Sequence, residues 1–286
     1  MKDFFLYEKA YIEDRGFPVR AFKVTVTDTN EAFHNHWHEQ MEIVYFLEGR
    51  GVVECNARRI AVRPGEAVFI NSNELHYGYA TTRPLSYYCI IFDTSLLKGS
   101  FEGNLEQKYI TPLSQNLIVF RNEVADDPLV RECILTIMEE SERKGDGYEL
   151  FVKSAVYRML ALLFRDHRER ILTEAQFKAQ SRTLERLNTV LRFIEENYAE
   201  EISLDDLARM ASLSRYRFSH VFKSLMGRGA REYINGYRIE KAEQLLKNTG
   251  MNITEVAMAT GFCDANYFSR LFARYKNTSP SALRKG

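Results

Sequence analysis

Arginine, asparagine, tyrosine and histidine recur at one-turn spacing in two short segments near the end of the chain. Tyr216 and His220 lie four positions apart in the first segment, and Asn266 and Arg270 lie four apart in the second. Each pair would therefore share one face of a helix. Asparagine and arginine are the side chains best shaped for paired hydrogen bonds to the edges of adenine and guanine. The pattern indicates contacts with DNA bases.

The same segments carry side chains suited to the DNA backbone. Cationic groups neutralise phosphates and so supply affinity that does not depend on base sequence. We assign phosphate contacts to the cations Arg215, Arg217, Lys223, Arg228, Arg274 and Lys276 and to the uncharged Tyr267. The alternative interpretation of both sets is a solvated polar face on a helical bundle, and the duplication described next argues against it.

The elements that would carry these residues occur twice. Leu207-Ala208 is matched by Val256-Ala257, 49 positions on, and Phe218-Ser219 is matched by Phe268-Ser269, 50 positions on. Each copy begins with a capping side chain that an acidic residue follows three positions later: Ser203 with Asp206, and Asn252 with Glu255. Such pairs start helices. A short helix, a sharp corner at 212–213 or 261–262 and a longer helix make a helix-turn-helix unit.

The segment between the two copies, 230–248, has the apolar stripe of a helix. Nineteen residues at ~1.5 Å each would span roughly 28 Å. Successive major-groove windows on one face of B-DNA lie about 34 Å apart. A rod of this length would present both units to successive turns of the duplex. Because the copies run head to tail, one protomer should read a non-palindromic site.

These residues resemble the AraC/XylS family of bacterial transcription regulators. The similar motifs are Ile253-x-x-Val-Ala-x-x-x-Gly-Phe262, Tyr267-Phe268-Ser-Arg-x-Phe272 and Ser279-Pro280, within a match that covers about 184–286. The resemblance implies base-reading positions at Tyr216, Ser219 and His220 in the first unit and at Ala265, Asn266 and Arg270 in the second. Ala265 departs from the polar residue often found there, which leaves it a contact to a thymine methyl group.

The N-terminal half has the pattern of a β domain followed by helices. Short apolar runs such as 41–47, 67–70 and 87–92 alternate with glycine-containing turns between about 20 and 95, which is typical of a sandwich or barrel. Helical spacing then predicts a hairpin over about 128–165, broken by Gly145-Asp-Gly147. The hairpin would cover the core or form a dimer surface. Apolar residues on more than one face of 151–164 favour the dimer.

Histidines in the β domain form a second pattern. The spacing His36-x-His38-x3-Glu42-x6-Gly49 resembles the first motif of the cupin barrel, and Gly65-x5-Asn71-x4-His76 resembles the second. Asn71 stands where proline is usual, and Ala80 where asparagine is usual. In metal-binding cupins the matching residues, here His36, His38, Glu42 and His76, converge on one divalent metal, and this donor set suits iron, manganese, nickel or zinc. The alternatives are a pocket for a small polar effector and a purely structural polar core; no cofactor is required for DNA binding.

Length, charge distribution and cysteine content agree with these motifs. The 286 residues suit two domains, and net charge is zero overall. From Gln176 onward 18 Lys and Arg face 12 Asp and Glu, a net +6, which leaves 21 against 27 in the rest. A basic C-terminal part favours a polyanion partner. The four scattered cysteines and the absence of a long apolar stretch predict a cytoplasmic protein without disulfides or a membrane anchor.

The sequence thus predicts an α+β multidomain protein. Residues 1–170 would form a cupin-like barrel with a helical hairpin, 171–182 a linker, and 183–286 an all-α domain with two helix-turn-helix units joined by a helix. We expect a transcription regulator, an activator by family resemblance, and not an enzyme. Its partners would be double-stranded DNA, a small-molecule effector with a sugar favoured, RNA polymerase, and a second copy bound through 128–165. The alternatives are a metal-dependent cupin enzyme fused to a DNA-binding module and a regulator whose ligand-free barrel serves only to dimerise.

Overall fold

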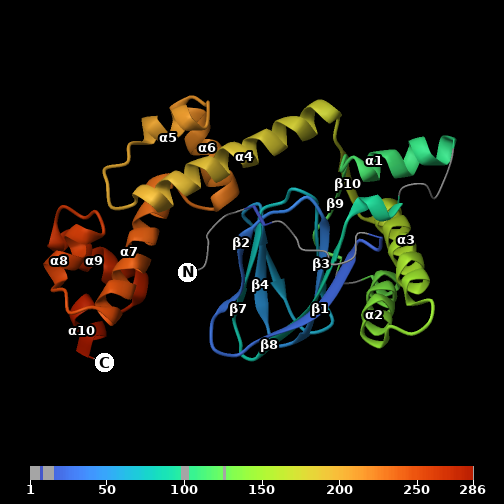
Figure 1. Cartoon of the computed structure of the whole chain (residues 1–286), viewed down its shortest axis with the longest axis horizontal. Coiled ribbons are helices and arrows are strands. Elements are labelled where there is room, and N and C mark those ends of the chain that lie inside the picture. The colour runs from blue at the N-terminus through green and yellow to red at the C-terminus, as the bar shows by residue number, and fades with distance from the viewer. Residues whose placement is uncertain (1–6, 9–15, 98–102, 125–126, 286) are drawn as a thin grey trace. The chain divides into compact units, whose positions relative to one another are not determined.

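The computed structural model describes residues 7–8, 16–97, 103–124 and 127–285. These residues fall into two compact units, Leu6–Arg182 and the chain from Thr183 onward, which Figure 1 shows as a β-rich part and a helical part. None of the helices in these ranges combines the length and the apolar character needed to span a bilayer.

Two antiparallel sheets of four strands form the core of the first unit. One sheet has the order β1 (Val19–Val26), β8 (Leu85–Phe92), β3 (Met41–Glu48) and β6 (Ala67–Ile70). The other has the order β2 (Glu31–His36), β7 (His76–Ala80), β4 (Gly51–Cys55) and β5 (Arg58–Val62). Val44, Phe46, Val53 and Cys89 belong to one buried cluster that strands of both sheets supply. The predicted β domain is confirmed.

Helices cover the outer face of the sheet that contains β3 and β8. Alternate side chains of β3, among them Ile43 and Tyr45, pack into a second buried cluster with residues of α2 (Pro128–Arg143) and α3 (Tyr148–Asp166). The predicted hairpin is therefore confirmed, and one of its faces covers the core, although the sequence favoured a dimer surface. Short elements complete this unit: η1 (Thr94–Leu97), η2 (Glu106–Ile110), α1 (Thr111–Ser114), and the paired strands β9 (Ile118–Phe120) and β10 (Arg168–Ile171).

Most of the segment expected to be a linker is helical. Helix α4 runs over Glu174–Asn197 and so begins within the expected linker 171–182. Its first turn is fixed by a reciprocal pair, in which Gln176 N donates to Thr173 Oγ1 at 3.2 Å and Thr173 N donates to Gln176 Oε1 at 2.8 Å. This is the capping box of a helix start. The signal Thr-x-x-Gln is present in the sequence, but the polar composition of 165–182 concealed it.

The second unit is helical, as predicted. After α4 come α5 (Leu204–Met210), α6 (Arg215–Met226), α7 (Ala230–Asn248), α8 (Ile253–Ala259), α9 (Ala265–Lys276) and α10 (Pro280–Lys285). The predicted joining helix 230–248 coincides with α7. Its first half contacts the first helix pair through the rings of Tyr233 and Phe222, whose centroids are 5.7 Å apart. Its second half supplies Ile239, Ala242 and Leu246 to the core of the second pair.

Candidate nucleic-acid interface and buried histidine cluster

Both short helices, α5 and α8, begin with the predicted caps. Ser203 Oγ accepts a hydrogen bond from Asp206 N at 3.1 Å. Asn252 Oδ1 accepts from Glu255 N at 2.9 Å, and Glu255 Oε2 accepts in return from Asn252 N at 2.7 Å. The second copy therefore has a complete capping box, which satisfies two backbone donors that the helix itself leaves unpaired.

The corners after these two helices are closed by the same backbone hydrogen bond. Leu213 N donates to Ala208 O, and Phe262 N donates to Ala257 O, both at 2.9 Å. The residue before each donor has positive φ, +52° at Ser212 and +81° at Gly261. The two copies therefore use the same turn. Glycine is required only in the second copy, because a Cβ at Gly261 would lie 2.7 Å from the carbonyl oxygen of Ala199.

The N-caps of the longer helices α6 and α9 are Ser214 and Asp264. Ser214 Oγ accepts from Arg217 N at 3.3 Å, and Asp264 Oδ1 accepts from Asn266 N at 2.7 Å. One face of each helix carries two buried phenylalanines, Phe218 and Phe222 in α6, and Phe268 and Phe272 in α9. Each pair of rings anchors its helix in the core and leaves the opposite face toward solvent.

That opposite face carries most of the predicted base-reading residues. Tyr216 is 84% exposed, and Ser219, His220, Asn266 and Arg270 are also exposed. Ala265 is half-buried. The exposed faces of α6 and α9 thus present polar and aromatic groups from capped helices, which is the arrangement a major-groove reader needs.

The predicted phosphate-binding residues differ in how free they are. Arg217, Lys223 and Arg274 are exposed. Arg215 instead forms an ion pair with Asp205 at 3.1 Å, and the Lys276 ammonium lies 2.5 Å from a Glu243 carboxylate oxygen. The remaining two also have neighbours: the Arg228 guanidinium lies 4.9 Å from the centroid of the Tyr233 ring, and the Tyr267 hydroxyl accepts a hydrogen bond from Asn235 at 3.4 Å.

Sequence reasoning missed Arg238, which lies in the middle of α7 and contacts both the segment before α5 and the corner of the second helix pair. Its guanidinium donates to the carbonyl oxygens of Tyr198 and Glu200 at 2.6 and 2.7 Å. It also lies 5.7 Å from the Phe262 ring at the second corner. Burial lowers the pKa of Arg238, although an arginine stays charged in practice. Arg238 therefore links the chain before the first helix pair to the turn of the second.

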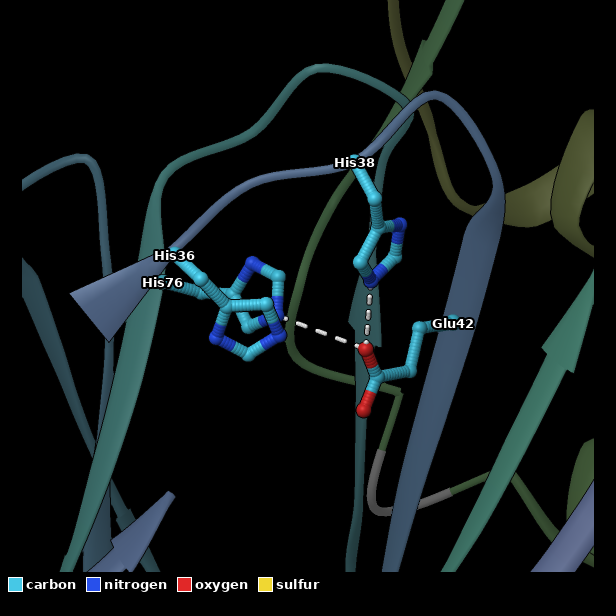
Figure 2. A group of neighbouring side chains, drawn as sticks. All are labelled: His36, His38, Glu42 and His76. Carbon is cyan, nitrogen blue, oxygen red and sulfur yellow. Dashed lines mark hydrogen bonds and ion pairs between the residues drawn. The ribbon is translucent and has the colours of Figure 1, made fainter. Parts of the chain in front are cut away.

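The four predicted metal or effector residues meet inside the β domain (Figure 2). His36 ends β2, His76 begins β7, Glu42 lies in β3 and His38 lies between β2 and β3. All four are buried. Their candidate ligand atoms lie within 4.8 Å of one another. His38 Nε2 is 2.8 Å and His76 Nε2 3.3 Å from the same oxygen, Glu42 Oε2.

The backbone fixes the proton on each of the three imidazole rings. The Nδ1 atoms of His36, His38 and His76 lie 2.8, 3.1 and 2.7 Å from the carbonyl oxygens of His34, Gln40 and Glu74. A carbonyl oxygen only accepts hydrogen bonds, so each Nδ1 carries the proton. In a neutral ring the Nε2 atom then has no proton, and its lone pair can only accept a hydrogen bond or bind a metal. Such hydrogen bonding of the far nitrogen is what orients histidines that bind metals.

The pKa of each of three cluster residues, Glu42, His76 and His36, depends on its neighbours in the cluster. Burial would raise the pKa of Glu42, but the imidazoles of His38 and His76 lower it well below its usual value. Burial also opposes the charged form of His76, yet its contact with Glu42 raises the pKa of that ring. Burial together with the neighbouring His76 lowers the pKa of His36 to about 2. His36 is therefore a neutral ring at any ordinary pH.

The amino-acid sequence matches two family models, which agree with the two structural units. One is described as an AraC-like ligand binding domain and matches residues 22–160. The other is described as a helix-turn-helix domain and matches residues 207–286. The chain belongs to the AraC family of transcription regulators. It is a DNA-binding transcription regulator with an N-terminal ligand-binding domain.

Relatives of this AraC-family chain match along most of its length. It is 24% identical to the uncharacterized HTH-type transcriptional regulator YdeC of Bacillus subtilis, over 94% of this chain and 92% of that protein. It is 27% identical to the HTH-type transcriptional activator RhaS of Escherichia coli, over 89% of this chain and 88% of that protein. Among solved structures, ToxT from Vibrio cholerae matches 94% of this chain and 98% of its own, at 14% identity and a TM-score of 0.40.

Two further neighbours of the histidine cluster were not expected from the motif. The Cys89 thiol donates to Glu42 Oε1 at 3.1 Å, so both carboxylate oxygens of Glu42 have partners. On the other side, a Glu8 carboxylate oxygen lies 3.4 Å from His34 Nε2 and 3.6 Å from His36 Nε2. No spacing rule joins position 8 to position 36, so sequence reasoning had no signal for this contact.

Proposed function

We propose that this AraC-family regulator reads two successive major-groove windows with α6 and α9. The observation that carries the proposal is the duplication of one capped unit with the same turn hydrogen bond in both copies. The polar faces of α6 and α9 supply base contacts through Tyr216, Ser219 and His220 and through Ala265, Asn266 and Arg270. Arg217, Lys223 and Arg274 contact phosphates. Arg215, Arg228, Tyr267 and Lys276 reach phosphates only by giving up, or sharing, the contacts described above.

The test is a binding titration with a DNA site selected from a random library by the full-length protein. Arg270→Ala should weaken binding to that site by ~1–3 kcal/mol, because one bidentate base contact is lost. Arg186→Ala is the matched control, since Arg186 is an exposed arginine on α4 and should leave affinity unchanged. Equal affinity of the Arg270→Ala protein and the wild type would refute the assignment of Arg270.

We propose further that the regulator acts as an activator and as a dimer. The relative RhaS of Escherichia coli is named as a transcriptional activator. The hairpin α2–α3 exposes a second apolar set beyond its buried face: Leu129, Leu135, Leu150 and Phe151, each at least 44% exposed. Burying this set against a second copy would remove apolar surface from water. Phe151→Asp should shift the sedimentation of the protein toward the monomer, and an unchanged dimer would refute this surface.

For the N-terminal unit we propose a divalent metal held by His36, His38, Glu42 and His76. The supporting observation is a mismatch between His38 Nε2 and Glu42 Oε2. These atoms lie 2.8 Å apart, and both are acceptors while the ring is neutral. A cation between them, or a proton on Nε2, removes the repulsion. Metal–ligand bonds of ~2.0–2.2 Å would place opposite ligand atoms about 4 Å apart, close to the spread in this cluster.

A bound metal would neutralise Glu42 and connect β2, β3 and β7. Metal analysis of the purified protein should find one equivalent, and Glu42→Gln should remove it. Glu54→Gln is the matched control, because Glu54 is an equally buried carboxylate of the same sheet sandwich whose partners are Arg59 and Tyr77. One equivalent of metal in both variants, or in neither variant nor the wild type, would refute the site.

The effector is proposed to bind within the same N-terminal unit, in keeping with its family model. Because the four cluster residues are almost inaccessible to solvent, they suit an ion better than a sugar-sized molecule. A thermal-shift screen of the full-length protein with sugars and small organic acids tests this point. Stabilisation by a sugar that the His76→Ala substitution abolishes, in protein free of metal, would favour the effector pocket over the metal.

A further inference from the structure

A cavity outside the β sandwich lies between the end of α3 and the segment 105–113. Its volume is about 530 Å³, within the range of sites for drug-sized ligands. Its wall is largely apolar, with Leu97, Leu113, Leu160 and Phe164 among the lining residues. The Tyr109 and Phe164 rings, both part of this wall, meet edge to face with centroids 5.2 Å apart. A ligand here would bury an apolar body.

Two arginines, Arg165 and Arg168, also line this cavity. Both are exposed, and neither forms an ion pair with a carboxylate within the part of the chain that the structure describes. Arg158, about two helical turns before Arg165 on α3, does have such a partner in Glu132, at 2.9 Å. The Arg168 guanidinium lies instead over the Phe164 ring, 4.9 Å from its centroid. Beside the cavity, the Lys108 ammonium lies 4.8 Å from the centroid of the Tyr109 ring.

We propose that this cavity binds an amphipathic carboxylate, with an acyl chain or similar apolar body against Leu113, Leu160 and Phe164. The carboxylate would lie at the rim between Arg165 and Arg168, where planar guanidinium groups offer paired donors to its two oxygens. Phe164 already holds the Arg168 side chain over its face, so little rotamer freedom is lost on binding. The apolar wall fits an apolar body, and the two arginines fit an anionic group, so one molecule that has both would match this cavity.

The position of the cavity suggests what such a ligand would stabilise. It joins the last turns of α3 to the η2–α1 segment, and Arg168 is the first residue of β10. Three residues after that strand, helix α4 begins at Glu174. A ligand bound to the folded protein only would stabilise these elements in proportion to its concentration and affinity. The cavity shares no residue with the histidine cluster, so the ligand proposal can be tested independently of the metal proposal.

The test uses isothermal titration of the full-length protein with dodecanoate, kept below its micelle concentration. We expect saturable binding of one equivalent, and at least a tenfold loss of affinity in Arg165→Ala with Arg168→Ala. Dodecanol, which lacks the carboxylate, should bind at least tenfold more weakly than dodecanoate to the wild type. Arg143→Ala is the matched control, since Arg143 is an exposed arginine at the end of α2.

A second variant separates this site from other apolar surfaces. Ala161 lines the cavity and is itself exposed, so Ala161→Trp should fill the space without disturbing the core. Binding should be lost in this variant and retained in His36→Ala. Binding that survives both Ala161→Trp and the double arginine substitution would overturn the proposal, as would the absence of saturable binding to the wild type. Circular dichroism of each variant verifies that it is folded.

Discussion

Replacing Gly261 by alanine should destabilise the helical unit selectively. Gly261 forms the corner of the second helix pair with φ at +81°. An added Cβ would lie 2.7 Å from Ala199 O and 2.9 Å from Ala199 C. Both neighbours are backbone atoms, so neither can rotate away. The Arg238 guanidinium, also 2.9 Å from that Cβ, is held by its bonds to Tyr198 and Glu200.

The size of this effect has two parts. A residue with a Cβ in the left-handed region costs ~1–2 kcal/mol, and forcing an extra carbon into a packed contact typically costs ~1–3 kcal/mol. The sum is ~2–5 kcal/mol of unfolding free energy. Ser212 helps to separate the two parts, because it occupies the same corner of the first copy with φ at +52°. The left-handed strain alone is therefore compatible with the fold, and the contact with Ala199 should make the larger difference.

Urea denaturation can follow the two units separately. Trp37 is the only tryptophan of the chain and is buried in the N-terminal unit, so its fluorescence reports that unit, while far-UV circular dichroism is sensitive to the helices. Gly261→Ala should shift the dichroism midpoint and leave the fluorescence midpoint in place. Gly250→Ala is the control, because its Cβ would meet nothing within 4 Å. Equal, small shifts in both variants would refute the steric argument.

Three further outcomes follow from the helical unit. Ser212→Gly should stabilise it by ~0.5–1 kcal/mol, since glycine carries no Cβ penalty at this positive φ; a loss of stability in urea unfolding would contradict this. Contacts with Lys247 and then Lys276 lower the pKa of Glu243 from 4.5, so the stability that this carboxylate contributes is present above pH 4.5 and is lost as pH falls through the lower folded-state pKa. The Glu243→Gln protein should therefore lose less stability than the wild type over that acidic range, measured by urea unfolding at several pH values. Lys223→Ala should reduce the slope of log affinity for DNA against log salt by about 1, with little change in sequence preference, and an unchanged slope would remove Lys223 from the phosphate contacts.

The helical unit could be predicted closely because its signals are local. Capping pairs and apolar periodicity act within a few turns of helix, and the 49-residue repeat shows the same local signals twice. The bounds of α7 and the starts of α6 and α9 follow from them. The contacts between the helix pairs could not be predicted, because Arg238 reaches carbonyl groups about 40 residues away. No periodicity reports such a distance.

The β domain was predicted as a class and not in its pairing. The run 41–47 lacks the polar alternation of a half-exposed strand, because β3 is buried on both faces. Its odd-numbered side chains, such as Ile43, pack under the helices, and even-numbered ones, such as Val44, pack between the sheets. The amino-acid sequence of a strand with two buried faces is a nearly continuous apolar run. The one charged residue in it, Glu42, points into the interior, which is where a charge most needs partners.

The partners of Glu42 bear on the interpretation of the histidine cluster. A purely structural polar core needs every buried donor to face an acceptor. With Nδ1 of each ring bound to a carbonyl oxygen two residues away, the neutral rings have only lone pairs to offer to Glu42. The cluster is therefore not self-sufficient in its neutral form, since His38, His76 and Glu42 together lack a positive charge. Either a proton on a ring or a metal ion must supply it, and the Glu42→Gln variant distinguishes them, because an amide can donate to Nε2 in place of the proton but cannot replace a carboxylate as a metal ligand.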